Sequence, residues 1–546
     1  MGGTVFYICL ILLVLLLVIS SLIRTNDKKK ARKQYLRDLF CDPQKNNPLS
    51  RPAGEPSFLG YLAKKHPGRF VIDRITAEDL QIGDLFRAMN RCVSFPGMDM
   101  LYSTLFTDTG NESEKSVYEE AKHFISDKES AISCLEILDR IPRYADTDEF
   151  MILEGLAGAK DSGLAADLLV IVLLILSLVL VSFYPAAGFA ALLVMIAVGI
   201  ASYFSGRRVM LEHLKGVSLS LRLIEAARDL ASYGRCEFSR YERLTSLCRF
   251  NGLISYRDGT SSDPLSIILD YVRMITHADI MIYKRKIAKI KKERDEILSL
   301  YRDIGHLDMC LSVASYISSK QCCGAYVNDR RCIEAKQLYH PLIADPVCND
   351  ISTYDPVLLT GSNASGKSTF LKAVGLNVLF AQNFGLAFAE SFTAGAFHVY
   401  TSMAVRDDLK GGNSYYVVEA RSIKRIVDAS DSLSLCIIDE VLRGTNTVER
   451  IAASSALLRF LSGKNCLCFA ATHDRELCTL LNDCMVMYHF TEEINEDNVT
   501  FPFLLKEGVS DRTNAIRLLD MLGFDQSIIK TADGLVARYK ETGNWT

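Results

Sequence analysis

The sequence predicts an α/β P-loop nucleotide-hydrolase domain with a mainly parallel sheet, joined to an α-helical lever and core domain and to transmembrane helices. Three observations predict this fold class: a glycine-rich loop between an apolar run and a helical pattern, two later apolar runs that end in acidic or histidine residues, and long stretches almost without charge. The chain has 546 residues and is 49% hydrophobic, which is high for a purely soluble protein. We therefore expect several domains and at least one membrane segment.

The first apolar stretch, residues 5–23, has no charged side chain and is long enough to cross the hydrocarbon core of a bilayer. A basic segment, residues 24–33, follows it and contains Asp27 as its only acidic residue. The positive-inside rule puts this basic flank in the cytoplasm. Because basic residues do not precede the apolar run and a small-residue cleavage site does not follow it, we expect an uncleaved anchor.

A second apolar block covers residues 164–204 and is interrupted at Tyr184-Pro185 and Gly188. Its length and its break predict a helical hairpin that crosses the membrane twice, and Arg207 and Arg208 after it agree with the positive-inside rule. Two core helices surrounded by protein would give the same pattern, but the scarcity of charge favours the membrane. With three spans in the cell membrane, everything from residue 205 onward is expected to be cytoplasmic.

These features predict the following division of the chain. It has a transmembrane anchor (1–23), a cytoplasmic helical domain (24–163), a transmembrane hairpin (164–206), a helical lever or coiled coil (207–333) and an ATPase domain (334–546).

The glycine-rich loop reads Gly-Ser-Asn-Ala-Ser-Gly-Lys-Ser at residues 361–368. An apolar strand is expected before it (356–360) and a helix after it (369–380), which is the context of a phosphate-binding loop rather than of a glycine turn that merely caps a helix. Backbone N–H groups would surround the phosphates, Lys367 would neutralise their charge and Ser368 would bind Mg²⁺. The residues expected to contact ATP here are Gly361, Ser362, Asn363, Ala364, Ser365, Gly366, Lys367, Ser368 and Thr369.

Two later strands are expected to bring catalytic side chains to this loop. The apolar run 433–438 ends in Asp439 and Glu440, where the aspartate would bind Mg²⁺ and the glutamate would orient or deprotonate the attacking water. The run 466–471 ends at Thr472 and His473, and the imidazole is expected near the γ-phosphate. The predicted catalytic residues are Glu440, His473 and Lys367, and the predicted metal ligands are Ser368 and Asp439.

A basic helix is predicted upstream of the loop. Its apolar positions follow a heptad pattern, if Arg294 is counted in the seam: Tyr283, Ile287, Ile290, Ile297, Tyr301 and Ile304. Between them lie Lys284, Arg285, Lys286, Lys289, Lys291 and Lys292. Such a helix fits DNA phosphates, anionic lipid head groups or simply a solvated coiled-coil face. The net charge of −3 argues against a nucleic-acid-coating surface over the whole protein.

The sixteen cysteines are scattered along the chain rather than arranged in pairs. Neither Cys322-Cys323 nor Cys466 with Cys468 has a second pair at zinc-site spacing. A reducing cytoplasm also disfavours disulfides. We therefore expect most cysteines to be small core residues and none to bind a metal.

Residues 339–529 resemble the ATPase domain of the MutS mismatch-repair family. Four of its motifs follow in the family's order: His-Pro-Leu-Ile at 340–343 before the loop, Asp-Asp-Leu at 407–409 with Gly411 and the stretch 414–419, Asp-Glu-Val-Leu-Arg-Gly-Thr-Asn at 439–446, and Ala-Thr-His-Asp-Arg-Glu-Leu at 471–477. Weaker similarity covers residues 84–101, which resemble the start of the family's helical core, and residues 304–318, which resemble the end of its lever.

The resemblance implies a homodimer with composite ATP sites, in which Ser414 completes the partner's site. It also implies ATP and Mg²⁺ as cofactors and binding of mismatched or branched DNA. The family's mismatch-reading N-terminal domain has no counterpart here, since Phe388 and Glu390 match its Phe-x-Glu wedge only by letter and lie within the ATPase region. The C-terminal dimerisation element is expected to be short or missing.

Three functions are compatible with these features. The first, which we prefer, is a membrane-anchored MutS-like ATPase whose ATP-dependent binding to DNA is switched by hydrolysis in a dimer, related to mismatch repair. The second is a membrane-bound ATPase switch that acts on a protein or lipid partner without DNA. The third is a component of an ABC-type transporter, but the Leu-Ser-Gly at 461–463 follows the acidic strand end, whereas a transporter signature precedes it.

Overall fold

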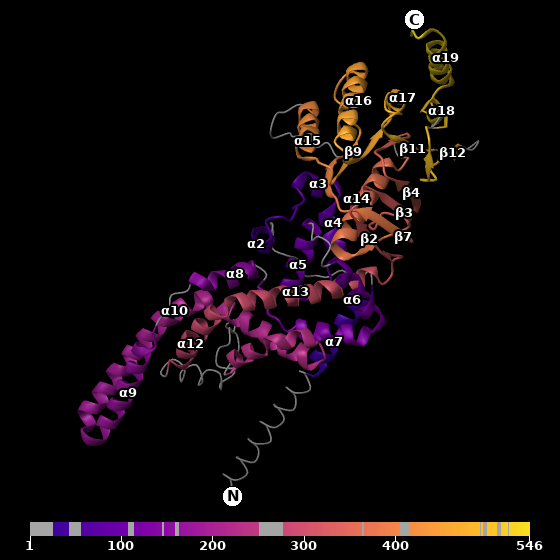
Figure 1. Cartoon of the computed structure of the whole chain (residues 1–546). Helices are drawn as coiled ribbons and strands as arrows, with labels where there is room; N and C mark the ends of the chain where they lie inside the picture. The colour runs from indigo at the N-terminus through magenta and orange to yellow at the C-terminus, as the bar shows by residue number, and fades with distance from the viewer. Residues whose placement is uncertain are drawn as a thin grey trace. The chain divides into compact units, whose positions relative to one another are not determined.

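The computed structural model in Figure 1 describes most of the chain. The described residues are 26–42, 56–107, 114–144, 147–158, 163–249, 277–362, 365–403, 415–491, 493–494, 499–509, 515–521 and 523–545. They fall into two compact units: the described parts of 1–67, 89–103 and 120–319 form one, and the described parts of 68–88, 104–119 and 320–546 form the other. We call them the helical unit and the sheet unit. The predicted first span, residues 5–23, lies outside the described residues.

The sheet unit is built on a six-stranded sheet with the strand order β14-β11-β5-β10-β9-β8. All neighbouring pairs are parallel except β11 with β14, so the prediction of a mainly parallel sheet is confirmed. The strands are β5 (Val357–Thr360), β8 (His398–Ser402), β9 (Ser434–Asp439), β10 (Leu467–Thr472), β11 (Val486–Phe490) and β14 (Leu505–Glu507). Every residue of β5, β9 and β10 is buried, as expected of central parallel strands.

Helices cover both faces of this sheet (Figure 1). On one face, α14 (Lys367–Phe384) packs so closely that a Cβ on Gly375 would lie 2.9 Å from the Ile437 side chain. On the other face, α15 (Tyr415–Ala429), α16 (Thr447–Gly463) and α17 (Glu476–Leu480) enclose a core that contains Cys436, Ile438 and Cys468. Alternate residues of β9 thus point to opposite helical layers. The cysteines are here core residues, as predicted for most of them.

Shorter strands complete the sheet unit. They form a four-stranded sheet of order β2-β7-β3-β4 and two pairs, β1-β6 and β12-β13. Their bounds are β1 (Cys323–Gly324), β2 (Tyr326–Asn328), β3 (Ile333–Leu338), β4 (Asn349–Thr353), β6 (Leu386–Ala387), β7 (Ser391–Gly395), β12 (Glu493–Ile494) and β13 (Val499–Thr500). The last helices are α18 (Ala515–Met521) and α19 (Gln526–Thr542).

A segment from the first part of the chain is attached to the edge strand β8 of the large sheet. Helix α3 (Arg74–Asp79) docks there, and the Asp79 carboxylate accepts hydrogen bonds from the Thr401 hydroxyl (2.7 Å) and from the Met403 backbone N–H (2.9 Å). Helix α4 (Ile82–Met89) follows it. These contacts explain why residues 68–88 belong to the sheet unit, a grouping that the sequence-based division did not include.

The helical unit consists almost entirely of packed helices. It contains α2 (Ser57–Lys65), α7 (Lys128–Leu138), α8 (Glu149–Gly155), η1 (Leu156–Gly158), α9 (Ala165–Phe183), α10 (Pro185–Ser232), η2 (Cys236–Cys248), α12 (Ala278–Lys292), α13 (Arg294–Ile317) and a helix over residues 26–41. Two more helices, α5 (Phe95–Phe106) and α6 (Glu114–Ser126), contribute residues to both units.

A buried carboxylate joins the two segments of the helical unit that resemble the MutS core and lever. Asp308, inside α13, accepts hydrogen bonds from the backbone N–H of Val93 and of Ser94 (2.8 Å) and from the Ser94 hydroxyl (2.5 Å), at the start of α5. This position supplies acceptors to N–H groups that the helix itself leaves unpaired. Burial raises the pKa of Asp308 to about 6. A side chain at Gly97 would lie 2.3 Å from the Asp308 carboxylate, which explains the glycine there.

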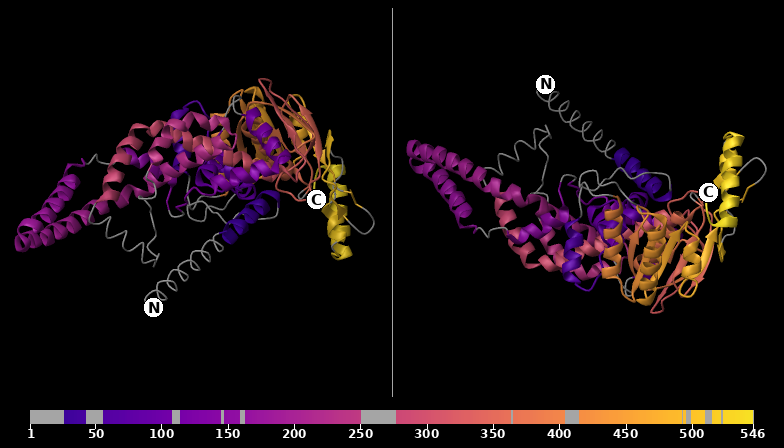
Figure 2. Two further views of the ribbon diagram at one scale, coloured as in Figure 1. Left: turned by 90° about the horizontal axis from the view of Figure 1, so that it is seen from below. Right: turned by 90° about the horizontal axis from the view of Figure 1, so that it is seen from above.

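Helix α9 and the first part of α10 form the predicted helical hairpin. In both views of Figure 2 it projects away from the other helices of its unit. Residues Ala165–Phe183 and Pro185–Phe204 are long and apolar enough to cross a membrane, and only 17% of each segment is buried in the protein. This exposure disfavours the alternative of two core helices. Length and composition make them candidate spans.

Helix α10 does not end at the Gly206-Arg207-Arg208 sequence, where we expected the hairpin to close. It continues to Ser232, and its 48 residues correspond to about 72 Å. Gly206 is tolerated within the helix because it allows close packing: a Cβ there would lie 3.0 Å from the Ile280 side chain. A single continuous helix therefore runs from the hairpin into the body of the helical unit.

The basic, heptad-patterned segment forms two helices, α12 and α13, separated at Glu293. All six apolar positions of the predicted seam are buried within the unit. Two lysines of the predicted basic surface are also used internally: Lys284 pairs with Asp167 at 2.6 Å, and Lys286 donates to the Leu247 carbonyl at 2.8 Å. The interpretation as one uniformly solvated basic face was therefore wrong for these two residues.

Replacement of Asp308 by alanine should destabilise the helical unit. The change leaves the N–H groups of Val93 and Ser94 without their buried acceptor, and we expect a loss of roughly 3 kcal/mol. The midpoint of thermal unfolding in detergent measures this effect. Asp295→Ala is the control, because Asp295 lies on the same helix with 97% of its side chain exposed. Equal midpoints for the two variants would contradict the role assigned to Asp308.

Candidate functional site

The candidate site lies where β5, β9 and β10 end at one edge of the large sheet. The register pairs Thr472 with Thr360 and Ala471 with Asp439, so the three strands end side by side. The predicted phosphate-binding loop therefore begins beside the predicted acidic and histidine positions. In open parallel sheets, this carboxyl edge is the usual location of ligand sites.

The loop between β5 and α14 depends on two glycines with left-handed backbone conformations. The φ angle is +147° at Gly361 and +106° at Gly366. A Cβ on Gly361 would also lie 2.9 Å from the backbone oxygen of Phe490 and from the Ser365 hydroxyl, so a larger residue would not fit. The two glycines therefore allow tight backbone conformations at the two ends of the loop, the second at the N-terminus of α14. Asn363 and Ala364 lie outside the described residues.

Two side chains of this loop are suited to bind phosphate oxygens. The Lys367 ammonium group is buried and donates to the carbonyl oxygens of Gly361 and Ser362, both at 2.7 Å. The Ser365 hydroxyl is also buried, with 1% of the residue exposed, and has no hydrogen-bond partner among the described residues. A buried unpaired hydroxyl is costly unless a ligand completes it. Ser362, Ser368 and Thr369 are exposed beside them.

The two predicted metal ligands are in direct contact. Ser368, in the first turn of α14, donates a hydrogen bond from its hydroxyl to the carboxylate of Asp439 at the end of β9. Burial raises the pKa of the Asp439 carboxyl, and the Ser368 hydrogen bond acts in the opposite direction. A hydroxyl and a carboxylate in direct contact provide oxygen ligands of the kind that Mg²⁺ prefers. Phosphate oxygens and water usually complete such a coordination shell. The residues present therefore fit Mg²⁺.

Glu440 is held in a strained backbone conformation next to this pair. Its φ is +60°, in the left-handed region that non-glycine residues rarely adopt, and its backbone N–H donates to the Ala471 carbonyl at 2.9 Å. Its carboxylate contacts the Arg443 guanidinium through Nε at 2.6 Å and the His473 imidazole through Nδ1 at 3.5 Å. The hydrogen bond with His473 and the Arg443 charge lower the pKa of Glu440. The ionised carboxylate can therefore orient a water molecule through hydrogen bonds.

His473 follows β10 and lies between two carboxylates. Its Nδ1 faces Glu440, and its Nε2 lies 3.7 Å from Asp474. The hydrogen bond to Glu440 raises the pKa of His473, and 45% of the side chain is exposed. Asp474 is fixed in turn by a two-point contact with Arg450 on α16, at 2.9 and 2.7 Å. This bidentate pair holds the histidine loop against α16.

Arg443 organises the loop after β9 by three contacts. Besides pairing with Glu440, it donates from its side chain to the Asp439 carbonyl (3.4 Å) and from its backbone N–H to Glu419 on α15 (3.2 Å). Glu419 is buried, and burial raises its pKa. These contacts agree with a role for Arg443 in holding the loop. Ser414, which precedes α15, lies outside the described residues, so its predicted role remains a prediction.

An apolar pocket of about 230 Å³ adjoins the phosphate-binding loop. Gly366 and Thr369 of the loop and the rings of Phe370, Phe490 and Phe503 form part of its wall. Flat aromatic walls next to a phosphate site suit the base of a nucleotide. His340, from the His-Pro motif, also lines this pocket, and burial together with the Lys372 charge lowers its pKa to about 4, so it is neutral at pH 7.

The structure thus brings together Lys367, Ser368, Asp439, Glu440 and His473, all of which the sequence singled out. Sequence reasoning missed the Arg450–Asp474 pair and the Arg443–Glu440 pair. Glu440, Arg443 and Asp474 lie inside the quoted motifs, but Arg450 does not, and no local sequence pattern signals these pairings.

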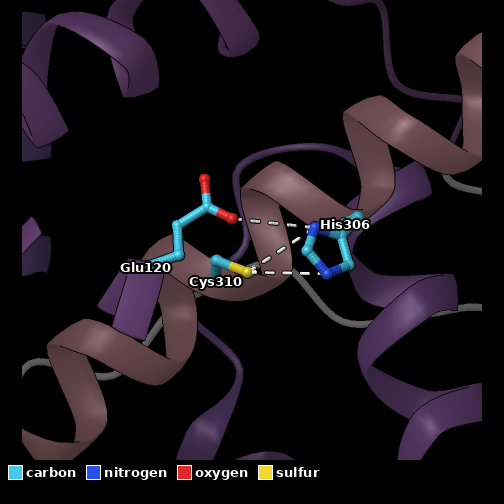
Figure 3. Close-up of side chains that lie close together, drawn as sticks. All are labelled: Glu120, His306 and Cys310. Carbon is cyan, nitrogen blue, oxygen red and sulfur yellow. Dashed lines mark hydrogen bonds and ion pairs between the residues drawn. The ribbon is translucent and has the colours of Figure 1, made fainter. Parts of the chain in front are cut away.

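A second polar cluster lies in the helical unit, where Figure 3 shows Glu120, His306 and Cys310. His306 Nδ1 lies 3.9 Å from the Glu120 carboxylate and 3.7 Å from Cys310 Sγ. Burial lowers the pKa of His306 and raises that of the Cys310 thiol. The trio supplies three ligand types that zinc accepts, but Arg235 already pairs with Glu120, and its charge opposes a cation. We assign no ion to this cluster, which sequence reasoning missed although His306 and Cys310 are one helical turn apart.

Comparison with known proteins shows which family the C-terminal part of the sheet unit resembles. Residues 357–540 match the family model described as MutS domain V. Among curated proteins, the chain is 31% identical over 269 residues to the DNA mismatch repair protein MutS of Thermotoga sp. (strain RQ2), covering 47% of this chain and 34% of that protein. The MutS of Natronomonas pharaonis is 26% identical over 283 residues, covering 49% and 33%. The match thus spans about a third of the length of these relatives.

Removal of the Glu440 charge should lower the pKa of His473. In Glu440→Gln the imidazolium loses the carboxylate that raises its pKa, so the value should fall towards that of an ordinary histidine. NMR titration of ring-labelled histidine measures it, and the chain has nine histidines to resolve. Glu541→Gln, at an exposed position of α19, is the control. An unchanged His473 pKa in Glu440→Gln would show that the two groups do not interact.

Proposed function

Because its sheet unit carries a MutS domain V, the chain belongs to the MutS family, and we propose that it is a membrane-anchored, Mg²⁺-dependent ATPase of the MutS type. The observation that carries this proposal is the direct contact between Ser368 and Asp439, with Glu440 and His473 beside them at one edge of the sheet. A structural turn would not need an unpaired buried Ser365 hydroxyl in the same loop.

Each residue of the site has a role in this proposal. The backbone N–H groups of the loop and the Lys367 ammonium group bind the β- and γ-phosphates of ATP. Ser368 and Asp439 would hold Mg²⁺, and the bound ion would supply positive charge against the phosphate oxygens. Glu440 orients the attacking water, and His473 senses the γ-phosphate through its contact with Glu440. The base lies in the pocket lined by Phe370 and Phe490.

We propose further that the protein works as a homodimer with composite sites. The relatives that the chain matches are DNA mismatch repair proteins, and by analogy Ser414 would complete the ATP site of the partner. ATP binding would close the dimer on mismatched or branched DNA, and hydrolysis would open it. This is a function inferred from the family rather than from any residue that reads bases.

Helices α9 and α10 are proposed to cross the cell membrane. Most of their apolar side chains are exposed to the surroundings, and exposed aromatic rings lie at both ends of the hairpin: Phe183 and Tyr184 at the turn, and Phe204 at the other end. Aromatic residues are enriched at such depths of a bilayer. Together with the predicted span at 5–23, this gives three spans and a cytoplasmic ATPase region.

A second candidate function is a membrane-bound ATPase switch that acts on a protein or lipid partner. It is favoured by the internal use of Lys284 and Lys286, because these charges are engaged within the helical unit and are less available to DNA phosphates. Both candidates share the same ATPase chemistry and differ only in the ligand of the helical unit.

Glu440→Gln should reduce ATP turnover by about 100-fold or more, since a positioned acid–base group contributes factors of that order. ATP binding should persist, because Lys367, Ser368 and Asp439 remain, and the variant should accumulate as an ATP-bound dimer. Turnover assays and mass photometry of the detergent-solubilised protein measure both properties. Glu541→Gln should behave like the wild type. Full turnover in Glu440→Gln, or a monomer with bound ATP, would contradict the proposal.

A further inference from the structure

A basic pocket lies at the base of the α9–α10 hairpin, outside the ATPase site. It has a volume of about 630 Å³, within the range of ~300–1,000 Å³ that is typical of ligand pockets. Its walls come from the two residues before α9, from the end of η2 and from α12. Five of its lining residues are basic and none is acidic: Arg249, Lys284, Arg285, Lys286 and Lys289.

The basic residues of this pocket divide into two groups. Lys284 and Lys286 build its wall, through the ion pair with Asp167 and the hydrogen bond to the Leu247 carbonyl. The other three, Arg249, Arg285 and Lys289, are exposed and form no ion pair with an acidic side chain of the described residues. Three cations that have no acidic partner in the described part of the chain thus lie around one cavity, where their mutual repulsion is unfavourable and an anionic ligand would relieve it.

The pocket is level with the ends of both candidate spans. Lys284 donates to the carbonyl of Gly163, immediately before α9, at 3.3 Å. One helical turn before Lys284 on α12, Ile280 packs on Gly206, just after the second candidate span ends at Phe204. His277, at the start of α12, contacts both helices of the hairpin, through Asp167 (3.2 Å) and the Gly199 carbonyl (2.9 Å). Phospholipid head groups occupy this depth of a bilayer.

We propose that this pocket binds the anionic head group of a membrane phospholipid. Arg249, Arg285 and Lys289 would bind the phosphate and any second anionic group, while Leu164 and Ile282 would contact the first carbons of the acyl chains. The inference rests on the proposed insertion of α9 and α10 into the membrane. Because the ligand would contact residues before α9, η2 and α12 together, it would fix the hairpin to the helix that leads into α13.

The combination of surfaces favours a lipid over a nucleic acid. Nucleic-acid sites present cations along an exposed face that follows the phosphate backbone. Here the cations surround a cavity that also has apolar walls, Leu164, Leu247, Ile282 and Ala288, which match a molecule with one charged and one apolar part. DNA binding at these residues is therefore an outcome that would overturn the proposal.

The test compares two triple variants with the same change in charge. Arg249→Gln/Arg285→Gln/Lys289→Gln removes the three exposed cations of the pocket, and Lys64→Gln/Lys65→Gln/Lys128→Gln removes three exposed lysines of α2 and α7. Native mass spectrometry of the full-length, delipidated protein in detergent measures binding of phosphatidylglycerol against phosphatidylcholine. We expect the pocket variant to bind phosphatidylglycerol at least ~10-fold more weakly, with the control variant unchanged.

Three results would overturn the proposal. They are equal phosphatidylglycerol binding by wild type and pocket variant, equally tight binding of inorganic phosphate alone, and loss of short duplex DNA binding in the pocket variant with lipid binding unchanged. If the pocket variant fails to fold, the single variant Lys289→Gln replaces it in the test, and we expect a smaller loss of phosphatidylglycerol affinity. Extraction of membranes with carbonate tests membrane insertion separately from lipid binding by the pocket. Release of the protein would contradict membrane insertion itself, whereas retention with unchanged lipid binding would contradict only the pocket.

Discussion

The parallel register of β5, β9 and β10 is the constraint on which the candidate site depends. Pairing Thr360 with Thr472 and Asp439 with Ala471 makes the strands end together, so that a loop, an acidic pair and a histidine from three distant parts of the chain meet. The strands are completely buried between helical layers. A slip in register would separate Ser368 from Asp439 and would also move core side chains out of place, so folding and chemistry are specified by the same contacts.

The charges of the site are arranged around Glu440. Its left-handed backbone conformation turns the chain sharply after β9, and the contacts with Arg443 and His473 keep its carboxylate ionised. Such strain is typical of sites where the surrounding structure fixes a residue for a purpose. A carboxylate with a lowered pKa is a weak base, so its contribution is better described as positioning of water than as complete removal of a proton. Arg450 and Asp474 then keep His473 within reach.

Local pattern allowed the central strands and the loop helix to be predicted, because continuous apolar runs and a glycine-rich turn determine them directly. The helical hairpin was predicted for the same reason. Contacts between distant residues were not predictable, because they depend on three-dimensional packing. Examples are the contact of Asp79 with β8, that of Asp308 with the start of α5, and that of Arg450 with Asp474. Gly206 resembled a helix end but is a packing position inside α10. Lys286 resembled a surface charge, yet its stem is buried and its ammonium group reaches the Leu247 carbonyl.

The most direct test of this account is the ATP turnover of the full-length protein in lipid nanodiscs. Turnover is measured without DNA and with single-stranded, paired, mismatched or branched DNA. The Glu440→Gln variant is the inactive control. The account predicts Mg²⁺-dependent turnover that changes when DNA is added, most strongly with mismatched or branched DNA. Turnover that is the same with every DNA would contradict the coupling to DNA and would favour the switch that acts on a protein or lipid partner.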